Sequence, residues 1–184
     1  MPSAQNWLLL LTYDGTRYCG WQVQLNLPTI EDTLEQAVKR LTGESVKVHG
    51  AGRTDSGVHA LNFTANFKTS AENFKIPEKW RIGLNAVLPN DIVVKFVQTV
   101  SPEFHARHSA IRKRYRYLIC NLPYKAAFSL KQSWWINQNL AIKRMEEAAQ
   151  ILIGEHDFSA FRASNCSSLN PLKNIREILI SKKR

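Results

Sequence analysis

The chain has 184 residues, of which 44% are hydrophobic and 22% are charged. These proportions are typical of a soluble globular protein, and a chain of this length can bury about 70% of its unfolded surface without disulfides or a structural metal. The 25 Lys and Arg residues outnumber the 15 Asp and Glu residues and give a formal charge of +10, which favours a polyanionic partner, nucleic acid before membrane.

The three cysteines, Cys19, Cys120 and Cys166, are far apart in the sequence and form no C-x-x-C pair. The sequence therefore indicates neither a disulfide framework nor a zinc site. Free thiols are typical of a reducing compartment, and we expect a cytoplasmic protein. The apolar run at residues 8–11 is too short for the core of a signal peptide and far shorter than a transmembrane helix.

The N-terminal part of the chain predicts a strand followed by a helix. Residues 7–13 are apolar and end at an Asp-Gly turn, which is typical of a buried strand. Thr29 is suited to cap a helix, with Asp32 completing a capping-box-like pattern, and Gly43 is suited to end it. An apolar stripe at helical spacing is expected to face the core. The stripe comprises Ile30, Leu34, Ala37, Val38 and Leu41.

Two strands and a second helix are expected next. Residues 45–49 are strand-like, and residues 61–68 alternate between apolar and polar side chains, as a half-buried strand does. Pro77 suits the first turn of a helix, because the N–H that it lacks would have no partner there. Residues 91–98 are rich in Val and Ile and predict a further strand.

Residues 50–60, called the signature loop below, connect two of these strands with the sequence Gly-Ala-Gly-Arg-Thr-Asp-Ser-Gly-Val-His-Ala. The loop carries Arg53, Asp55 and His59 between three glycines, which permit tight bends. The simpler interpretation is an ordinary surface loop with an Arg–Asp pair. A metal cluster of His49, Asp55 and His59 can also be drawn, but their spacing matches no strong metal template, and we expect no metal.

Residues 111–118 interleave basic and aromatic side chains. As a strand, they would place Arg112, Arg114 and Arg116 on one face, with Tyr115 on the other. Three guanidiniums cannot be buried in a dry core, so that face must meet solvent, acidic groups or phosphate. Charge for the backbone and rings for bases suit an RNA surface. A solvated edge strand with its tyrosines in the core is the alternative.

The rest of the chain is less regular. Residues 121–135 are expected to form an irregular loop. A third helix follows, with an apolar side between Leu140 and Leu152, and Gly154 ends it. Residues 173–181 are the last strand candidate.

Several blocks of the sequence resemble the tRNA pseudouridine synthase A family. The most specific is the Gly-Arg-Thr-Asp run in the signature loop. The others are residues 18–24, 84–89, 104–110 and 154–162. The resemblance implies an α+β fold with two halves, residues 1–100 and 101–184, and the second half is expected to be incomplete. It also implies a mostly antiparallel sheet flanked by helices, and a central RNA-binding cleft.

The resemblance further implies an isomerase that converts uridine to pseudouridine at positions 38 to 40 of the tRNA anticodon arm. Such an enzyme needs no cofactor, and the family works as a homodimer. Asp55 corresponds to the catalytic aspartate, as nucleophile or base, and Arg53 would support base flipping. Tyr115 corresponds to the tyrosine that stacks on the target uracil. RNA-binding roles are expected for Gln22, Arg107, Arg112, Arg114 and Arg116.

The sequence departs from the family pattern in two places. Asn62-Phe63 stands where the family more often has Gly-Gln, and a C-terminal Phe-Leu-x-x-Met-Val-Arg-like segment is not found. The second departure keeps an alternative open: a truncated, catalytically impaired fragment that binds tRNA. A two-carboxylate hydrolase, using Asp55 with Asp14 or Asp157, is a third and weaker hypothesis, because no second carboxylate lies in a comparable motif.

Overall fold

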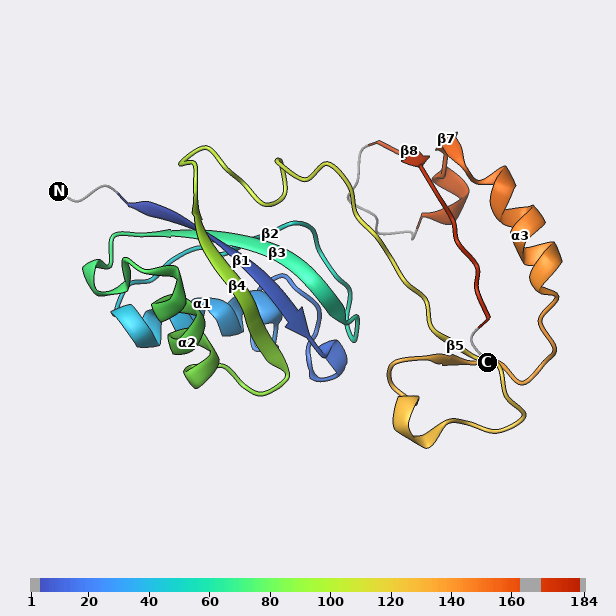
Figure 1. Ribbon diagram of the computed structural model, residues 1–184, viewed down its shortest axis with the longest axis horizontal. Helices are drawn as coiled ribbons and strands as arrows, with labels where there is room; N and C mark the ends of the chain where they lie inside the picture. Colours follow the sequence, from blue (N-terminus) through green and yellow to red (C-terminus); the bar gives the residue numbers. More distant parts are fainter. Residues whose placement is uncertain (1–3, 163–169, 183–184) are drawn as a thin grey trace. The chain divides into compact units, whose positions relative to one another are not determined.

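The computed structural model describes residues 4–162 and 170–182, so Cys166 lies outside the described residues (Figure 1). The chain forms two compact units, Met1–Arg116 and Tyr117–Arg184. Helices and mostly antiparallel strands make up the described elements, which is the α+β class expected from the sequence. Among the described residues, no helix is long and apolar enough to cross a membrane.

A four-stranded antiparallel sheet forms the centre of the first unit. Its strands are ordered β2-β3-β1-β4, so the central strands are β3 and β1. The strands are β1 (Gln5–Tyr13), β2 (His49–Gly50), β3 (Ala60–Thr69) and β4 (Ile92–Val100). Alternate residues of β1, from Trp7 to Tyr13, are at most 3% exposed, because they share one face of the strand.

Two helices cover this buried face of the sheet. Helix α1 (Ile30–Thr42) contributes Leu34, and α2 (Pro77–Val87) contributes Trp80, to the same core cluster as Trp7. The Trp7 and Trp80 rings lie 5.9 Å apart, centroid to centroid, at a tilt of 56°, a geometry that aromatic pairs favour. The core of the first unit therefore lies between one sheet face and two helices.

The ends of both helices follow the predicted signals. Thr29 Oγ1 accepts a hydrogen bond from the backbone N–H of Asp32 at 3.4 Å, which satisfies one free donor of the first turn of α1. Gly43 ends α1 in the left-handed conformation, with φ 78°. Pro77 is the first residue of α2. The predicted helix boundaries are confirmed here.

Two buried asparagines hold the segment that follows β4. Asn66 Nδ2 donates to Asn6 Oδ1 at 2.9 Å, and Asn66 Oδ1 accepts from the backbone N–H of Ala106 at 2.8 Å. Asn6 Nδ2 donates to the carbonyl oxygens of Ser101 and Phe104, both at 2.9 Å. These bonds fix residues 101–106 on the sheet, so the first unit extends to Arg116, beyond the expected boundary near residue 100.

The Asn66→Ala variant is expected to lose about 1–3 kcal/mol of unfolding free energy, because it leaves the buried Ala106 N–H without a partner. Urea denaturation measures this loss. Asn62→Ala is the matched control on the same strand: its amide meets only the exposed Lys95 ammonium, and we expect it to stay within about 0.5 kcal/mol of wild type. Equal losses in both variants would contradict the role given to Asn66.

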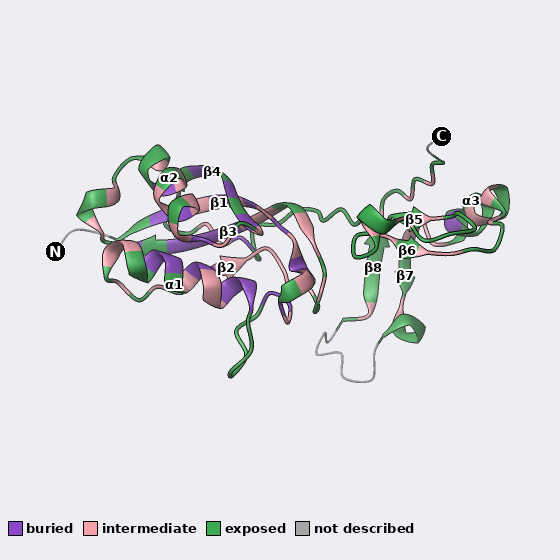
Figure 2. Cartoon of the chain, turned by 90° about the horizontal axis from the view of Figure 1, so that it is seen from below, coloured by how far each residue is buried: buried purple, intermediate pink, exposed green. Residues whose placement is uncertain are grey.

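The second unit has short elements and few buried residues. Helix α3 (Ile142–Ile151) confirms the third predicted helix. Its strands are β5 (Ile119–Cys120) parallel to β6 (Trp134–Trp135), and β7 (Gly154–Asp157) antiparallel to β8 (Leu172–Ile175). Among the described residues of this unit, only Ala149 is buried (Figure 2). On the expected apolar side of α3, Leu140, Met145 and Leu152 are half-buried and Ala148 is exposed.

Three strand predictions need correction. Residues 111–118 are exposed and form no strand, because none of the described strands pairs with them. Of residues 45–49, only His49 belongs to a strand, since Glu35 Oε1 instead accepts the backbone N–H of Val48 at 3.0 Å. The last strand, β8, ends at Ile175. The predicted loop over residues 121–135 contains a short 3₁₀ turn and β6.

Candidate active site and nucleic-acid groove

The signature loop lies between β2 and β3, and the segment before α1 holds its backbone. The backbone N–H of Trp21 donates to the Thr54 carbonyl oxygen at 3.0 Å. The N–H of Gly57 and the hydroxyl of Ser56 both donate to the Tyr18 carbonyl oxygen, at 3.2 and 3.3 Å. The family-like blocks at residues 18–24 and 50–60 are therefore joined to each other by hydrogen bonds.

Gly20 is the point where these two backbones come closest. Its φ is +89°, and a Cβ atom added there would lie 2.4 Å from the Thr54 carbonyl oxygen. Both the backbone conformation and the contact require glycine at this position. A larger residue would push the loop away on the Thr54–Asp55 side, where the candidate catalytic carboxylate is attached.

Two side-chain contacts anchor the loop from β1 and the turn after it. Tyr13 Oη lies 3.1 Å from Thr54 Oγ1. Burial raises the pKa of Tyr13 to about 12, so the phenol stays protonated near neutral pH and can donate to Thr54. His59 Nδ1 lies 3.2 Å from the Gly15 nitrogen and 3.0 Å from Asp14 Oδ1. His59 and Asp14 thus serve the loop's attachment to the unit.

Arg53 and Asp55 have a different setting from these anchoring residues. Both are exposed, and neither side chain makes a hydrogen bond or an ion pair among the described residues. The Arg–Asp pair of the simpler surface-loop interpretation is therefore not formed among the described residues. The loop is tied down through its backbone, Thr54, Ser56 and His59, while its guanidinium and its carboxylate remain available to a ligand.

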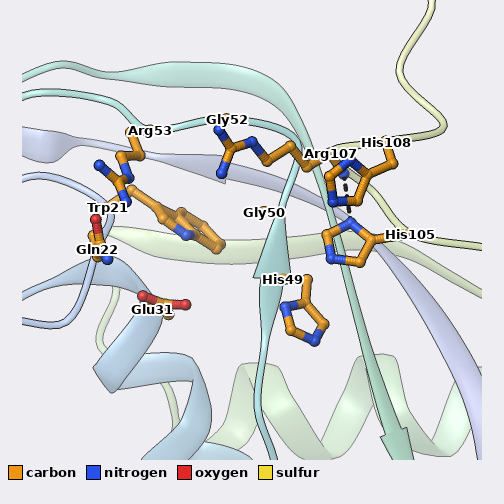
Figure 3. Close-up of a pocket in the computed structure, with 10 residues that line it drawn as sticks. All are labelled: Trp21, Gln22, Glu31, His49, Gly50, Gly52, Arg53, His105, Arg107 and His108. Atoms are coloured by element: carbon orange, nitrogen blue, oxygen red, sulfur yellow. Dashed lines mark hydrogen bonds between the residues drawn. The ribbon is translucent and has the colours of Figure 1, made fainter. Parts of the chain in front are cut away.

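A groove of about 170 Å³ lies beside the loop (Figure 3). It brings together Gln22, Arg53 and Arg107, three of the residues expected to act on RNA. Its remaining lining residues are Trp21, Glu31, His49, Gly50, Gly52, His105 and His108. The histidines of the groove were not predicted, although residues 104–108, Phe-His-Ala-Arg-His, place two of them beside Arg107 in the sequence.

Trp21 forms a rigid part of the groove wall. It is 3% exposed and stacks on Phe63 at 4.4 Å between ring centroids and an angle of 30°. Gly50 lies against it, because an added Cβ would come within 2.5 Å of the indole. Phe63, where the sequence departs from the family pattern, therefore has a packing role under the groove.

Three imidazoles lie together on one side of the groove, with Arg53 and Gln22 on the other (Figure 3). The His105 ring centroid is 4.6 Å from that of His49 and 4.4 Å from that of His108. The backbone N–H of Arg107 donates to His105 Nδ1 at 3.1 Å, which leaves Nε2 as the protonated nitrogen of the neutral ring. Partial burial, then the neighbouring His49 and His108, lower the pKa of His105.

These histidines do not assemble a metal site. Within residues 4–162 and 170–182, no group of three or more His, Cys, Asp or Glu side chains is arranged to hold a metal ion. The Glu31 carboxylate at the groove accepts the Val23 N–H at 2.9 Å and lies 3.1 Å from Lys47 Nζ. The groove therefore combines free guanidiniums with imidazoles and one internally compensated carboxylate.

Residues 111–118, which interleave basic and aromatic side chains, lie only partly at the groove. Lys113 reaches the signature loop, since an added Cβ on Gly52 would lie 2.5 Å from its Nζ. Tyr115 is 70% exposed and does not line the groove, so its stacking role stays a prediction. Arg112, Arg114 and Arg116 are also exposed and outside the lining. Their phosphate contacts stay predictions as well.

Comparison with known proteins decides the family. A family model described as tRNA pseudouridine synthase matches residues 10–109. A tRNA pseudouridine synthase A from Thermoanaerobacter sp. (strain X514) is 47% identical over 179 residues, which are 97% of this chain and 72% of that protein. The chain belongs to the tRNA pseudouridine synthase family.

Further members of this family show the same extent of similarity. The tRNA pseudouridine synthase A of Acetivibrio thermocellus is 44% identical, with 97% of this chain and 72% of that protein aligned. That of Blochmanniella pennsylvanica is 43% identical, with 97% of this chain and 68% of that protein aligned. The region matched by the family model contains the whole signature loop and all the residues that line the groove.

Proposed function

We propose that the protein isomerises uridine to pseudouridine at positions 38 to 40 in the anticodon arm of tRNA. One observation carries the proposal: Arg53 of the signature loop lines a basic groove, and Asp55 lies two residues further along the same loop, outside the groove lining. Neither side chain has a hydrogen-bond or ion-pair partner among the described residues. This arrangement occurs in a chain of the tRNA pseudouridine synthase family. The net charge of +10 suits a tRNA substrate.

The isomerisation needs no redox partner and no water. The bond between N1 of uracil and C1′ of ribose breaks, the base turns, and a bond between C5 and C1′ forms. The C5 hydrogen leaves as a proton, and N1 gains one, so atoms and electrons balance without a cofactor. Asp55 acts as the nucleophile or the base in this reaction, because a carboxylate can form a covalent intermediate or accept a proton.

Access to the uridine requires base flipping. Extruding a base from a stem costs a few kcal/mol, which contacts made only to the extruded form must offset. Arg53 lines the groove and has no ion-pair partner in the described part of the chain, so it supports the extruded nucleotide or its phosphate. Tyr115 stacks on the uracil, and Gln22 and Arg107 hold the RNA beside it. Arg112, Arg114 and Arg116 contact further phosphates.

Release of tritium from uridine-5-tritiated tRNA tests the proposal, because only replacement of the C5 hydrogen frees the label. We expect release by the protein without added metal or cofactor. Tight tRNA binding without release would instead indicate a tRNA-binding fragment, and free uracil would indicate a hydrolase. We further propose a cytoplasmic protein, which free thiols suit, and a homodimer, as the family resemblance implies. Light scattering in solution tests the dimer.

The Arg53→Ala and Arg107→Ala variants are expected to weaken tRNA binding severalfold, with only small effects on folding, because neither side chain is paired within the unit. If each contacts one phosphate, the slope of log K against log salt should fall by about 0.7–0.9 per variant. Filter binding over a salt series measures this. Arg40→Ala, an exposed change on α1 away from the groove, is the control. An equal change in slope for Arg40→Ala would contradict the assignment.

A further inference from the structure

The groove beside the signature loop has the composition of an anion site. Arg53 and Arg107 line it, and neither forms an ion pair among the described residues. Figure 3 shows the Arg107 side chain extending over the groove from the histidine side. Two unpaired guanidiniums around a volume of about 170 Å³ suit a phosphate group, because guanidinium donors match phosphate oxygens in geometry and charge.

The three imidazoles add a charge that depends on pH. His105 lies between His49 and His108, within 4.6 Å of each ring centroid, so a proton on one ring is opposed by a proton on either neighbour. Arg107 also repels a proton on His105. Its neighbours therefore oppose protonation of His105 when no anion is bound. An anion bound in the groove has the opposite effect on these histidines, because its negative charge favours the protonated imidazole.

The other charged groups around the three imidazoles leave the groove positive, so they do not cancel its attraction for an anion. Arg53 from the signature loop and Lys113 above Gly52 are positive. Glu31 from α1 is the one carboxylate of the groove lining, and it is 6% exposed. Its oxygens already meet Lys47 Nζ at 3.1 Å and the Val23 N–H at 2.9 Å. Glu31 is thus compensated, and the groove has a net positive potential.

We propose that this groove is a proton-linked phosphate site, in which His49, His105 and His108 take up a proton when a phosphate of the RNA backbone binds between them and the two guanidiniums. The identity of the ligand as RNA rests on the proposed function. The neutral His105 keeps Nδ1 for the Arg107 N–H, so Nε2 is its donor toward a ligand. The site makes tRNA binding stronger as the pH falls.

The number of protons taken up on binding sets how strongly tRNA binding depends on pH. Uptake of one proton on binding changes the binding constant by up to about tenfold per pH unit, within the range where the group titrates. Histidines titrate between about pH 5 and pH 8, so we expect tRNA binding to be about tenfold tighter at pH 5.5 than at pH 8. The ionic strength must be held constant, because phosphate contacts are salt-dependent.

The test compares tRNA binding at these two pH values in matched variants. The triple variant His49→Gln, His105→Gln, His108→Gln is expected to lose the pH dependence. His156→Gln, at an exposed position in the second unit, is expected to keep it. The same RNA is used throughout, so titration of the RNA itself cancels. A triple variant that retains the full tenfold change overturns the proposal.

NMR titration of the histidine rings in the wild-type protein provides a second readout, which does not depend on whether a variant folds. Addition of an anticodon-arm RNA is expected to raise the pKa of His105, and inorganic phosphate is expected to do so at much higher concentration. If inorganic phosphate raises the pKa of His105 but the RNA does not, the RNA does not occupy the site. If neither ligand raises this pKa, no phosphate group binds there. Either result overturns the proposal. Tritium release is measured separately, so proton-linked binding without isomerisation would reject the proposed function and leave this site standing.

Discussion

Asp55→Asn is expected to abolish isomerisation while tRNA binding stays within about twofold of wild type. The carboxylate makes no hydrogen bond or ion pair among the described residues, so its replacement by an amide of equal size removes no polar interaction. An amide is neither a nucleophile nor a base at neutral pH. We expect the rate of tritium release to fall by at least about a thousandfold, which lies within the range for loss of a catalytic proton-transfer group.

The control for this variant is Glu72→Gln, which neutralises an exposed carboxylate on a 3₁₀ turn of the same unit. It changes the net charge by the same amount, and we expect unchanged turnover. Thermal unfolding of both variants should match wild type. Turnover by Asp55→Asn at a rate near wild type would remove Asp55 from the mechanism, whatever its effect on binding.

Gly20→Ala is expected to have the largest effect on stability. Its Cβ would lie 2.4 Å from the Thr54 carbonyl oxygen, and the backbone at φ +89° disfavours any side chain. Overpacking against backbone and left-handed strain together should cost about 3 kcal/mol. The loop must also shift on its Asp55 side, so turnover should fall further than the loss of folded protein explains. Urea denaturation measures the loss of stability. Tritium release per folded molecule measures the loss of turnover.

Gly43→Ala separates the two causes of this loss. Gly43 has φ +78°, close to that of Gly20, but an added Cβ meets nothing within 4 Å. It should therefore cost only the left-handed conformation, about 1 kcal/mol, and leave turnover per folded molecule unchanged. Similar losses in the two variants would show that the close contact between Gly20 and the signature loop is unimportant.

Local signals in the sequence predicted the elements that depend on local physics. Thr29, Gly43 and Pro77 mark helix ends because capping and the missing proline N–H act within one turn. The apolar stripe of α1 predicted its buried face for the same reason. The signature loop could be identified as a whole from its resemblance to the tRNA pseudouridine synthase A family, because its composition alone is also that of an ordinary surface loop.

Features that depend on distant partners were not predicted. The alternation in residues 111–118 is compatible with a strand, but a strand needs a neighbour, and no described strand pairs there. Asn66 occupies a polar position of its strand, yet it is 1% exposed because residues 101–106 fold over it. His49 and His105 are far apart in sequence. They meet because His49 pairs with Asn66 across β2 and β3, and Asn66 also holds the backbone N–H of Ala106, next to His105.

The most direct test of the central proposal is position-resolved detection of pseudouridine in an unmodified tRNA transcript after incubation with the protein. The account expects pseudouridine in the anticodon arm, at positions 38 to 40, with wild-type protein and with Glu72→Gln, and none with Asp55→Asn. Pseudouridine formation that persists in Asp55→Asn, or its complete absence with wild-type protein that binds the same transcript, would contradict the account.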